Sequence, residues 1–372
     1  MSKGECRWGI LGAAVIAQKN WQSIHNSGNG TILAVASRDR EKAARFIQAR
    51  QQECPFPVEP DACTYEELLA RSDIDAVYIP LPTGLRKEWV IRAARAGKHV
   101  MCEKPCAVHA DELREMLQVC HEHRVQFMDG VMFMHSQRLQ AIRGILNDGL
   151  SIGDIRRISS HFSFRAPDEF LASNIRVSSE LEPHGCLGDL GWYCIRFALW
   201  ALNSQMPVEI SARLLAHHGR ADSPDVVPME LSAELKFPND VSFGFFCSFL
   251  IEQQQTATIS GTRGYLHVSD FVLPNFGNEV AFQVINNDFQ VAGCRFNMSN
   301  HTRRVAVNEY SNNHPNAQET RLFRHFGDLV QSGQIDETWG EVALKTQIIV
   351  DACLESARNN GRCISPCMEG QA

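Results

Sequence analysis

The chain has 372 residues, which is more than a domain with a single hydrophobic core usually contains, so its length predicts two domains. Hydrophobic residues make up 44% of the chain and charged residues 21%, a composition typical of a soluble globular protein. The formal net charge of -7 provides no overall positive field, which disfavours nucleic acid and anionic membranes as partners.

The cysteines favour a reducing, cytoplasmic compartment, because the 13 of them are scattered and include no Cys-x-x-Cys pair. Cys102 and Cys106, like Cys363 and Cys367, are separated by three residues, but no histidines stand at matched spacing, so we expect no metal site. The apolar run at residues 8–17 imitates a signal peptide. Its glycines, and the strand and helix pattern that follows, argue against export, and no segment is long enough to span a bilayer.

The first third of the chain alternates short β-rich runs with amphipathic helical stretches, the pattern of a parallel sheet built from βαβ units. The predicted strands are Arg7–Leu11, Ile32–Ser37, Ala76–Leu81, His99–Glu103 and Gln126–Met128. The predicted helices are Arg40–Gln51, Arg86–Ala96 and Asp111–Arg124. We therefore expect residues 1–128 to form a doubly wound Rossmann domain that binds NAD(P).

Residues 129–372 are expected to form an α+β domain with a large, mainly antiparallel sheet. The predicted strands are Asp154–Phe164, Val208–Leu215, Glu230–Phe237, Val241–Phe249, Thr256–Ser260 and Tyr265–Val268. Turn residues at 239–240 and 261–264 predict hairpins. The segments Ala216–Pro228 and Asn286–Thr302 are polar and turn-rich, which predicts loops. Helices near Glu319–Gln331 and Gly340–Asn359 are expected to pack back and close the molecule.

The strand Val241–Phe249 indicates how this sheet is covered. Its odd-numbered residues are large and apolar apart from one cysteine, whereas the even-numbered ones are serine, glycine and one phenylalanine. We expect helices on the first face. The second face is flatter and would suit a second subunit, which predicts a homodimer or homotetramer.

The first strand leads into a degraded dinucleotide-binding turn, made of Gly12, Ala13, Ala14, Val15 and Ile16. Alanines replace the second and third glycines of that motif, but the N–H groups and positive dipole end of a helix N-terminus can still hold a pyrophosphate. Since the turn follows the first strand of a βαβ unit, we favour cofactor binding over a simple tight turn.

The end of the second strand predicts which cofactor is preferred. An acidic residue there usually binds the ribose 2'-hydroxyl of NAD, but this strand ends in Ser37 and Arg38. A hydroxyl and a guanidinium suit a 2'-phosphate, so NADP is favoured and NAD stays possible. In the alternative, Arg38 is solvated surface and Asp39 serves NAD.

Several motifs together resemble the glucose-fructose oxidoreductase / inositol dehydrogenase (Gfo/Idh/MocA) family. The residues Glu103-Lys104-Pro105, which follow a buried strand, resemble its signature. Four further segments resemble family motifs and occur in the same order along the chain: Trp8-Gly9-Ile10-Leu11-Gly12, Tyr78-Ile79-Pro80-Leu81-Pro82, Gly188-Asp189-Leu190-Gly191-Trp192-Tyr193 and Gly261-Thr262-Arg263-Gly264. The similarity extends over residues 7–365 and is greatest to the branch with dimeric dihydrodiol dehydrogenase and NADP-dependent xylose dehydrogenases.

This resemblance implies a Rossmann domain, an open-faced sheet domain and an active site between them. It further implies that Pro80, Leu81, Pro82, Glu103 and Lys104 line the cofactor site. Hydride transfer from an alcohol also needs a group that accepts the hydroxyl proton. The Lys104 ammonium, at the carboxyl end of a parallel strand, could bind the reacting oxygen, although a surface salt bridge is the simpler alternative.

The segment Cys186–Leu202 is predicted to be a helix on which Asp189 and Tyr193 lie one turn apart. By its match to the family, Tyr193 is the proton acceptor or donor, and Asp189 holds a substrate hydroxyl or orients the tyrosine. In the alternative, Tyr193 is a partly buried aromatic with a satisfied hydroxyl. His135, Arg176 and His184 could also line the substrate cleft, but isolated histidines are more often structural.

The chain departs from the family pattern in ways that bear on cofactor fit and substrate. Ala14 stands where glycine is common, Thr83 where asparagine is common and Arg86 where histidine is common. Glu182-Pro183-His184 replaces part of a glycine-rich segment. The expected substrate is a sugar or polyol, with a trans-dihydrodiol or sugar-sugar oxidoreduction as the nearest enzymatic alternatives. A non-catalytic, NADP-sensing regulator is the alternative from another class.

Overall fold

The computed structural model describes residues 4–366, which divide into two compact units. The first unit contains the described residues up to His135, together with Ser178–Pro183 and Asn312–Gln347. The second contains Ser136–Val177, His184–Ser311 and the described residues from Ile348 on. The division predicted after residue 128 stays a prediction.

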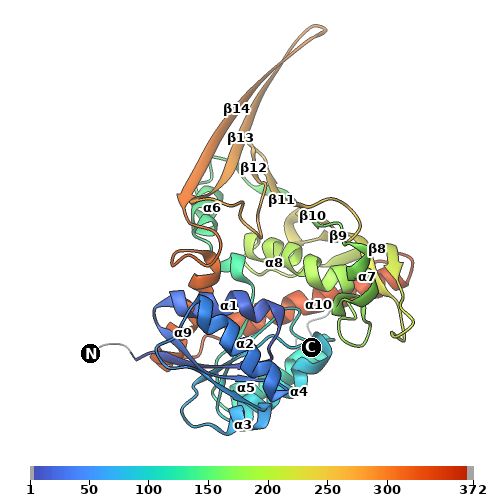
Figure 1. Ribbon diagram of the computed structural model, residues 1–372. Coiled ribbons are helices and arrows are strands. Elements are labelled where there is room, and N and C mark those ends of the chain that lie inside the picture. Colours follow the sequence, from blue (N-terminus) through green and yellow to red (C-terminus); the bar gives the residue numbers. More distant parts are fainter. Residues whose placement is uncertain (1–3, 367–372) are drawn as a thin grey trace. The chain divides into compact units, whose positions relative to one another are not determined.

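The first unit, whose N-terminal part is coloured blue to cyan in Figure 1, is built on a six-stranded parallel sheet with the strand order β3-β2-β1-β4-β5-β6. This is the order of a doubly wound dinucleotide-binding fold, and it confirms the predicted Rossmann architecture. The strands are β1 (Cys6–Leu11), β2 (Gly30–Ala36), β3 (Asp61–Cys63), β4 (Ala76–Ile79), β5 (His99–Cys102) and β6 (Phe127–Asp129).

The helices of this unit are α1 (Val15–Ser27), α2 (Arg40–Glu53), α3 (Tyr65–Ala70), α4 (Thr83–Arg95), α5 (Ala110–Glu122), the short η1 (Met132–His135), α9 (Gln318–Ser332) and the first part of α10 (Thr338–Arg358). One core cluster, which includes Trp8, Trp21 and Phe323, joins α1, α2 and α9 to the sheet. Trp8 packs edge-on against Phe323 at 5.5 Å between ring centroids. The C-terminal helix α9 thus completes the N-terminal core, as expected.

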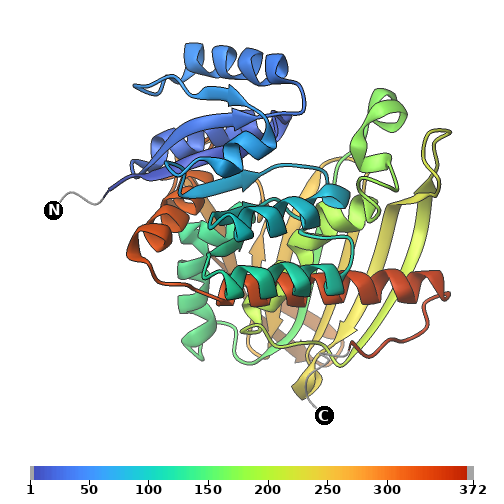
Figure 2. The ribbon, with the colours of Figure 1, turned by 90° about the horizontal axis from the view of Figure 1, so that it is seen from below.

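The second unit contains an eight-stranded sheet with the order β14-β13-β12-β11-β7-β10-β9-β8, whose strands are seen in Figure 2. Every pairing is antiparallel except that of β10 with β7, so the predicted mainly antiparallel sheet is confirmed. The strands are β7 (Ile155–Ser163), β8 (Glu209–His218), β9 (Val227–Lys236), β10 (Ser242–Ser248), β11 (Gln254–Gly261), β12 (Tyr265–Val268), β13 (Glu279–Ala292) and β14 (Arg295–Asn308).

The helical segments of this unit are α6 (Gln137–Asn147), α7 (Asp168–Ser173), η2 (Ile175–Val177), η3 (Leu187–Gly191), α8 (Trp192–Ala201), η4 (Pro238–Asp240) and the second part of α10. In β10, Phe243, Phe245 and Cys247 are buried on one face; on the other face Ser242 and Phe246 are partly exposed, but Gly244 and Ser248 are buried. The hairpin turns expected at residues 239–240 and 261–264 join β9 to β10 and β11 to β12.

The prediction of a loop over Asn286–Thr302 is wrong, because these residues belong to the hairpin of β13 and β14. Pairing of β13 with β12 ends at Ile285, but its ladder with β14 continues to Ala292, so the hairpin extends beyond the neighbouring strands (Figure 1). Both faces of this extension are exposed, and the alternation of apolar residues that indicates a strand is therefore weak. The predicted loop Ala216–Pro228 is correct only in its middle, since β8 runs to His218 and β9 begins at Val227.

Candidate active site

The turn after β1 has the geometry of a nucleotide-binding turn. Gly12 has φ of 129°, a conformation that glycine adopts far more readily than other residues, and its N–H donates to the Ala36 carbonyl at 2.9 Å. The helix α1 begins at Val15 without a side-chain cap. Val15 is 83% exposed, so the N-terminus of α1 opens to solvent with two apolar side chains, Val15 and Ile16, at its rim.

Two predicted cofactor residues, Pro80 and Leu81, lie directly against this turn. A Cβ atom on Gly12 would stand 3.1 Å from the Leu81 side chain and 3.7 Å from that of Pro80. The next residue, Pro82, is the N-cap of α4 and offers no side-chain acceptor to the helix. The segments after β1 and β4 therefore meet at the carboxyl edge of the sheet, where ligands bind in such folds.

At the end of β2, the Arg38 side chain is exposed, whereas the Asp39 carboxylate is engaged by its own helix. This carboxylate accepts a hydrogen bond from the Glu41 N–H at 2.9 Å and caps α2. Asp39 also lies 3.6 Å from Arg45. The buried Ser37 hydroxyl accepts a bond from the Asp39 N–H at 3.3 Å. The carboxylate that would serve a ribose hydroxyl is thus engaged by its own helix.

Glu103, predicted to line the cofactor site, is buried in a polar cluster of the first unit. The Tyr78 hydroxyl donates to its carboxylate at 2.6 Å, and Asn20 lies 2.6 Å from Tyr78 and 3.4 Å from Glu103. Burial and the Glu103 carboxylate raise the pKa of Tyr78 well above its ordinary value. This cluster anchors the start of the Glu103-Lys104-Pro105 segment, while Lys104 is partly exposed and the peptide bond that joins it to Pro105 is cis.

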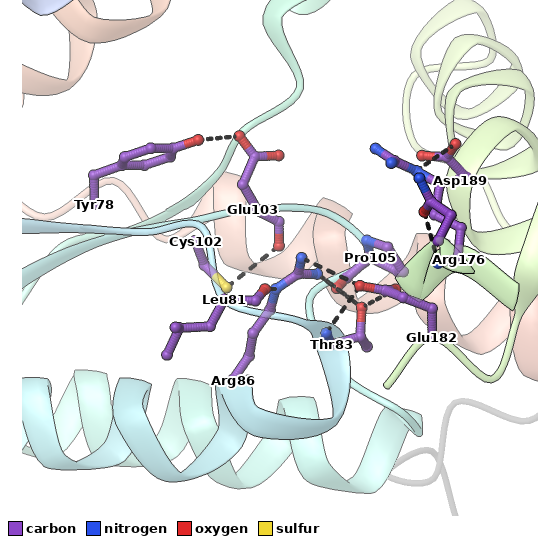
Figure 3. A network of polar contacts seen from close by, with 11 residues as sticks. Tyr78, Leu81, Thr83, Arg86, Cys102, Glu103, Pro105, Arg176, Glu182 and Asp189 are labelled. Carbon is purple, nitrogen blue, oxygen red and sulfur yellow. Dashed lines mark hydrogen bonds and ion pairs between the residues drawn. The ribbon is translucent and has the colours of Figure 1, made fainter. Parts of the chain in front are cut away.

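Three of the residues that depart from the family pattern contact one another (Figure 3). The Glu182 carboxylate accepts hydrogen bonds from the Thr83 hydroxyl at 2.6 Å and the Thr83 N–H at 3.1 Å. The Arg86 guanidinium donates to the Thr83 hydroxyl at 2.9 Å, to the Leu81 carbonyl at 2.7 Å and to the Pro105 carbonyl. Thr83 and Arg86 are 1% and 5% exposed, so this is a buried polar network.

In the second unit, Asp189 forms an ion pair with Arg176 at 2.9 Å (Figure 3). Asp189 belongs to η3, a turn of π-helix that leads directly into α8. The predicted helix over Cys186–Leu202 therefore exists, but its first turn is wider than the α-helical spacing assumed for Asp189 and Tyr193. Such π turns often occur at functional sites. A Cβ on Gly191 would stand only 2.8 Å from Leu187, which shows how closely this turn is packed.

Tyr193 occupies the first turn of α8 and is 7% exposed, with its ring 5.8 Å from that of Phe162. Every residue of α8 except Trp200 is buried. The charged Arg196 is fully buried, with its guanidinium 6.0 Å from the Trp192 ring centroid. A helix enclosed on all sides fixes its side chains by packing.

Two further candidates for the substrate cleft are His135 and His184. His135 stacks on Trp339 with ring centroids 4.8 Å apart, and His184 is buried, 3.9 Å from an Asp351 carboxylate oxygen.

Among the described residues, no group of three or more His, Cys, Asp or Glu could hold a metal ion. Cys102 and Cys106 are both buried, and burial raises the pKa of the Cys106 thiol; Cys367 lies outside the described residues. Within residues 4–366, no helix is long and apolar enough to cross a membrane.

Sequence reasoning missed the roles of Asn20 and Tyr78 as partners of Glu103, and the contact of Glu182 with Thr83. Tyr78 stood in a quoted motif, but a tyrosine in a strand ordinarily reads as core. Glu182 follows Thr83 by 99 residues, and no local pattern links the two. The sequence did hold one chemical signal for this contact. Glu182, Thr83 and Arg86 replace common family residues, and their carboxylate, hydroxyl and guanidinium groups can bind one another.

Two family models match the chain and together cover most of the two units. An oxidoreductase family model, described as an NAD-binding Rossmann fold, matches residues 6–131, and a GFO/IDH/MocA C-terminal domain model matches residues 139–267. The chain belongs to the Gfo/Idh/MocA family of oxidoreductases. The resemblance inferred from the motifs around Lys104 and Tyr193 is thereby confirmed.

Known members of the Gfo/Idh/MocA family are similar over much of the chain. Trans-1,2-dihydrobenzene-1,2-diol dehydrogenase of Mus musculus is 29% identical over 80% of this chain and 87% of that protein. The dTDP-3,4-didehydro-2,6-dideoxy-alpha-D-glucose 3-reductase of Actinomadura kijaniata is 27% identical over 95% and 96%. The fold matches the crystal structure of a 3-ketoreductase from Actinomadura kijaniata in complex with NADP and TDP-benzene, with a TM-score of 0.78, 24% identity and 95% and 98% coverage.

Proposed function

We propose that this family member is an NADP-dependent oxidoreductase that transfers a hydride between the nicotinamide and a hydroxyl-bearing carbon of a sugar or polyol. The observation that carries the cofactor preference is the position of Asp39, which caps α2 and leaves Arg38 exposed at the end of β2. The similar proteins, a diol dehydrogenase and a deoxysugar 3-reductase, support a diol or sugar substrate whose reacting carbon carries a hydroxyl or carbonyl group.

The residues present suit a dinucleotide. The positive φ of Gly12 and the uncapped start of α1 leave room and N–H donors for a pyrophosphate that Gly12, Ala13, Ala14, Val15 and Ile16 would hold. Ser37 and Arg38 would bind the 2'-phosphate, and Pro80, Leu81, Pro82 and Glu103 would border the rest of the cofactor. NAD stays possible, since its binding at the turn needs no 2'-phosphate.

Bound NADP would supply the hydride acceptor for alcohol oxidation. As the C–H bond breaks, the hydroxyl proton must leave, and we assign its acceptance to Tyr193 in its phenolate form. The phenol formed in this way returns the proton in the reverse direction. The Lys104 ammonium would donate a hydrogen bond to the reacting oxygen and stabilise negative charge there. Asp189, held by Arg176, would accept a hydrogen bond from a neighbouring substrate hydroxyl or orient the tyrosine.

The test is the absorbance of the reduced cofactor when the protein is mixed with NADP and a panel of aldoses, polyols and trans-diols. We expect turnover with at least one aldose or polyol, and faster reaction with NADP than with NAD. Turnover confined to trans-dihydrodiols would favour the activity of the mouse relative instead. NADP binding without turnover of any panel member would favour the non-catalytic regulator.

We also propose that the protein is a cytoplasmic homodimer or homotetramer that associates through the flatter face of the eight-stranded sheet. This face carries small and polar residues such as Ser159, Thr258 and His267, with Phe246 partly exposed among them. The described cysteines form no disulfides, which suits a reducing compartment. Light scattering at micromolar concentration tests the assembly, and a monomer would contradict it.

A further inference from the structure

The N-terminus of α4 is capped from a distant part of the chain. Pro82 at the N-cap offers no acceptor, and the Glu182 carboxylate accepts the Thr83 N–H instead, at 3.1 Å. A second bond, from the Gly84 N–H to the Leu181 carbonyl at 3.0 Å, holds the same segment. A carboxylate is favoured at this position because the helix dipole places positive charge there. Glu182 is therefore built into the helix start.

From this cap, a directed chain of hydrogen bonds leads toward Lys104. The Thr83 hydroxyl has one proton, and the 2.6 Å contact with Glu182 is the shorter of its two acceptor contacts, the other being 3.3 Å to the Pro105 carbonyl. It therefore donates to Glu182 and accepts from Arg86 at 2.9 Å. Arg86 in turn donates to the Pro105 carbonyl, which belongs to the residue that follows Lys104.

Charge and burial hold this series of hydrogen bonds rigidly in place. Arg86 is 5% exposed, and a carboxylate oxygen of Glu182, whose side chain is 12% exposed, lies 3.9 Å from its guanidinium. The Arg86 donors point to the main-chain carbonyls of Leu81 and Pro105, so the guanidinium joins the backbone after β4 to the backbone after β5 (Figure 3). A buried, satisfied polar network of this kind fixes the groups that it joins.

We propose that Thr83, Arg86 and Glu182 form a positioning network that sets the backbone of Lys104 for its contact with the reacting oxygen. The proposal rests on the proposed function of Lys104. None of the three side chains touches the substrate in this scheme, because their donors and acceptors are directed to one another and to backbone carbonyls. They are positioning residues, and each differs from the residue common in the family.

The experiment uses variants of the full chain that change one link at a time. Thr83→Val removes the hydroxyl and keeps the shape, whereas Thr83→Ser restores a hydroxyl. Glu182→Gln keeps the size of the side chain and removes its charge. The matched control is Glu180→Gln, an exposed glutamate of the same segment. Circular dichroism and thermal unfolding establish that each variant folds.

Two readouts are compared. The first is kcat and KM on a panel substrate, together with NADP affinity. The second is the rate at which an acylating reagent modifies Lys104, measured by mass spectrometry, which needs no turnover. We expect Thr83→Val and Glu182→Gln to lower kcat about 10-fold, with KM and NADP affinity within about 2-fold, since one buried hydrogen bond is lost or weakened. Lys104 should be acylated faster by about 3-fold or more as its loop loosens, and Thr83→Ser should recover both values.

The outcomes separate this inference from the proposed function. If the wild type turns over no substrate but the acylation rates differ as expected, the proposed function fails and the positioning network stands. If acylation of Lys104 is the same in Thr83→Val, Glu182→Gln, Glu180→Gln and wild type, the network does not position Lys104. An equal fall in kcat in the control Glu180→Gln would likewise overturn it, because that pattern indicates a general structural effect.

Discussion

The regions that carry Lys104 and Tyr193 hold their side chains by different physical means. Lys104 lies in a short segment after β5, and the hydrogen bond from the Arg86 guanidinium to the Pro105 carbonyl fixes that segment. Tyr193 lies on a helix whose residues, except one, are buried. The position of a side chain in a loop depends on a few directed hydrogen bonds, whereas its position on an enclosed helix depends on how well the side-chain volumes pack. The loop should therefore respond to the loss of one polar group, and the helix to a change in size.

The largest effect is expected from removing the Tyr193 hydroxyl while preserving its packing. Tyr193→Phe should lower turnover by about 100-fold or more with little change in NADP affinity, because proton transfer typically contributes that much. Lys104→Ala, by contrast, should lower both turnover and NADP affinity. Steady-state kinetics and cofactor titration measure these values. Near-normal turnover of the phenylalanine variant would assign the proton to Lys104 or to water.

Arg38 is exposed, so neither packing nor a buried hydrogen-bond network holds its side chain, and its expected contribution is to the preference for NADP over NAD. Wild type should prefer NADP over NAD by about 10- to 150-fold, since a charge-assisted bond to the 2'-phosphate contributes roughly 1.5–3 kcal/mol. Arg38→Ala should remove most of this preference, and salt should reduce it in wild type. The measurement is titration of both cofactors. An unchanged ratio in Arg38→Ala would contradict the assignment; Ser37→Ala should have a smaller effect.

Two glycine substitutions test whether volume governs the helix region. Gly191→Ala should reduce the free energy of unfolding by about 1–3 kcal/mol, because the new Cβ would stand 2.8 Å from the Leu187 side chain and 3.4 Å from that of Phe245. Gly144→Ala is the control, since Gly144 is exposed in α6 with nothing within 4 Å. It should stabilise by about 0.5–1 kcal/mol. Urea unfolding measures both, and equal effects would refute the packing argument.

The smallest effect is expected at the ion pair of Arg176 with Asp189. Their side chains are 42% and 15% exposed, so solvent screens the pair. Arg176→Gln should lower turnover by about 3-fold at low salt, which corresponds to about 0.65 kcal/mol and lies within the range of exposed pairs. The difference from wild type should vanish in about 1 M salt. Arg165→Gln, at another exposed arginine of this unit, is the control. A 100-fold loss would mean that Arg176 itself contacts substrate.

The sequence predicted the first sheet almost completely, because parallel strands buried on both faces appear as compact apolar runs between amphipathic helices. It missed β3 and α3 there, which span three and six residues and are too short for a periodic signal, and it indicated α1 only by the helix start after the Gly12 turn. The long hairpin of β13 and β14 was missed for the opposite reason. Residues 287–300 are exposed on both faces, so no burial pattern marks them as strands.

The sequence alone determined the family, the two kinds of sheet and the identity of the candidate groups at Gly12, Arg38, Lys104, Asp189 and Tyr193. These depend on local motifs, in which neighbouring residues carry the information. Only the tertiary structure showed that Asp39 caps its own helix, that the turn before Tyr193 is π-helical, and that Glu182 binds Thr83 across 99 residues of sequence. Such contacts depend on folding, which brings distant donors and acceptors together in a buried place where each must find a partner.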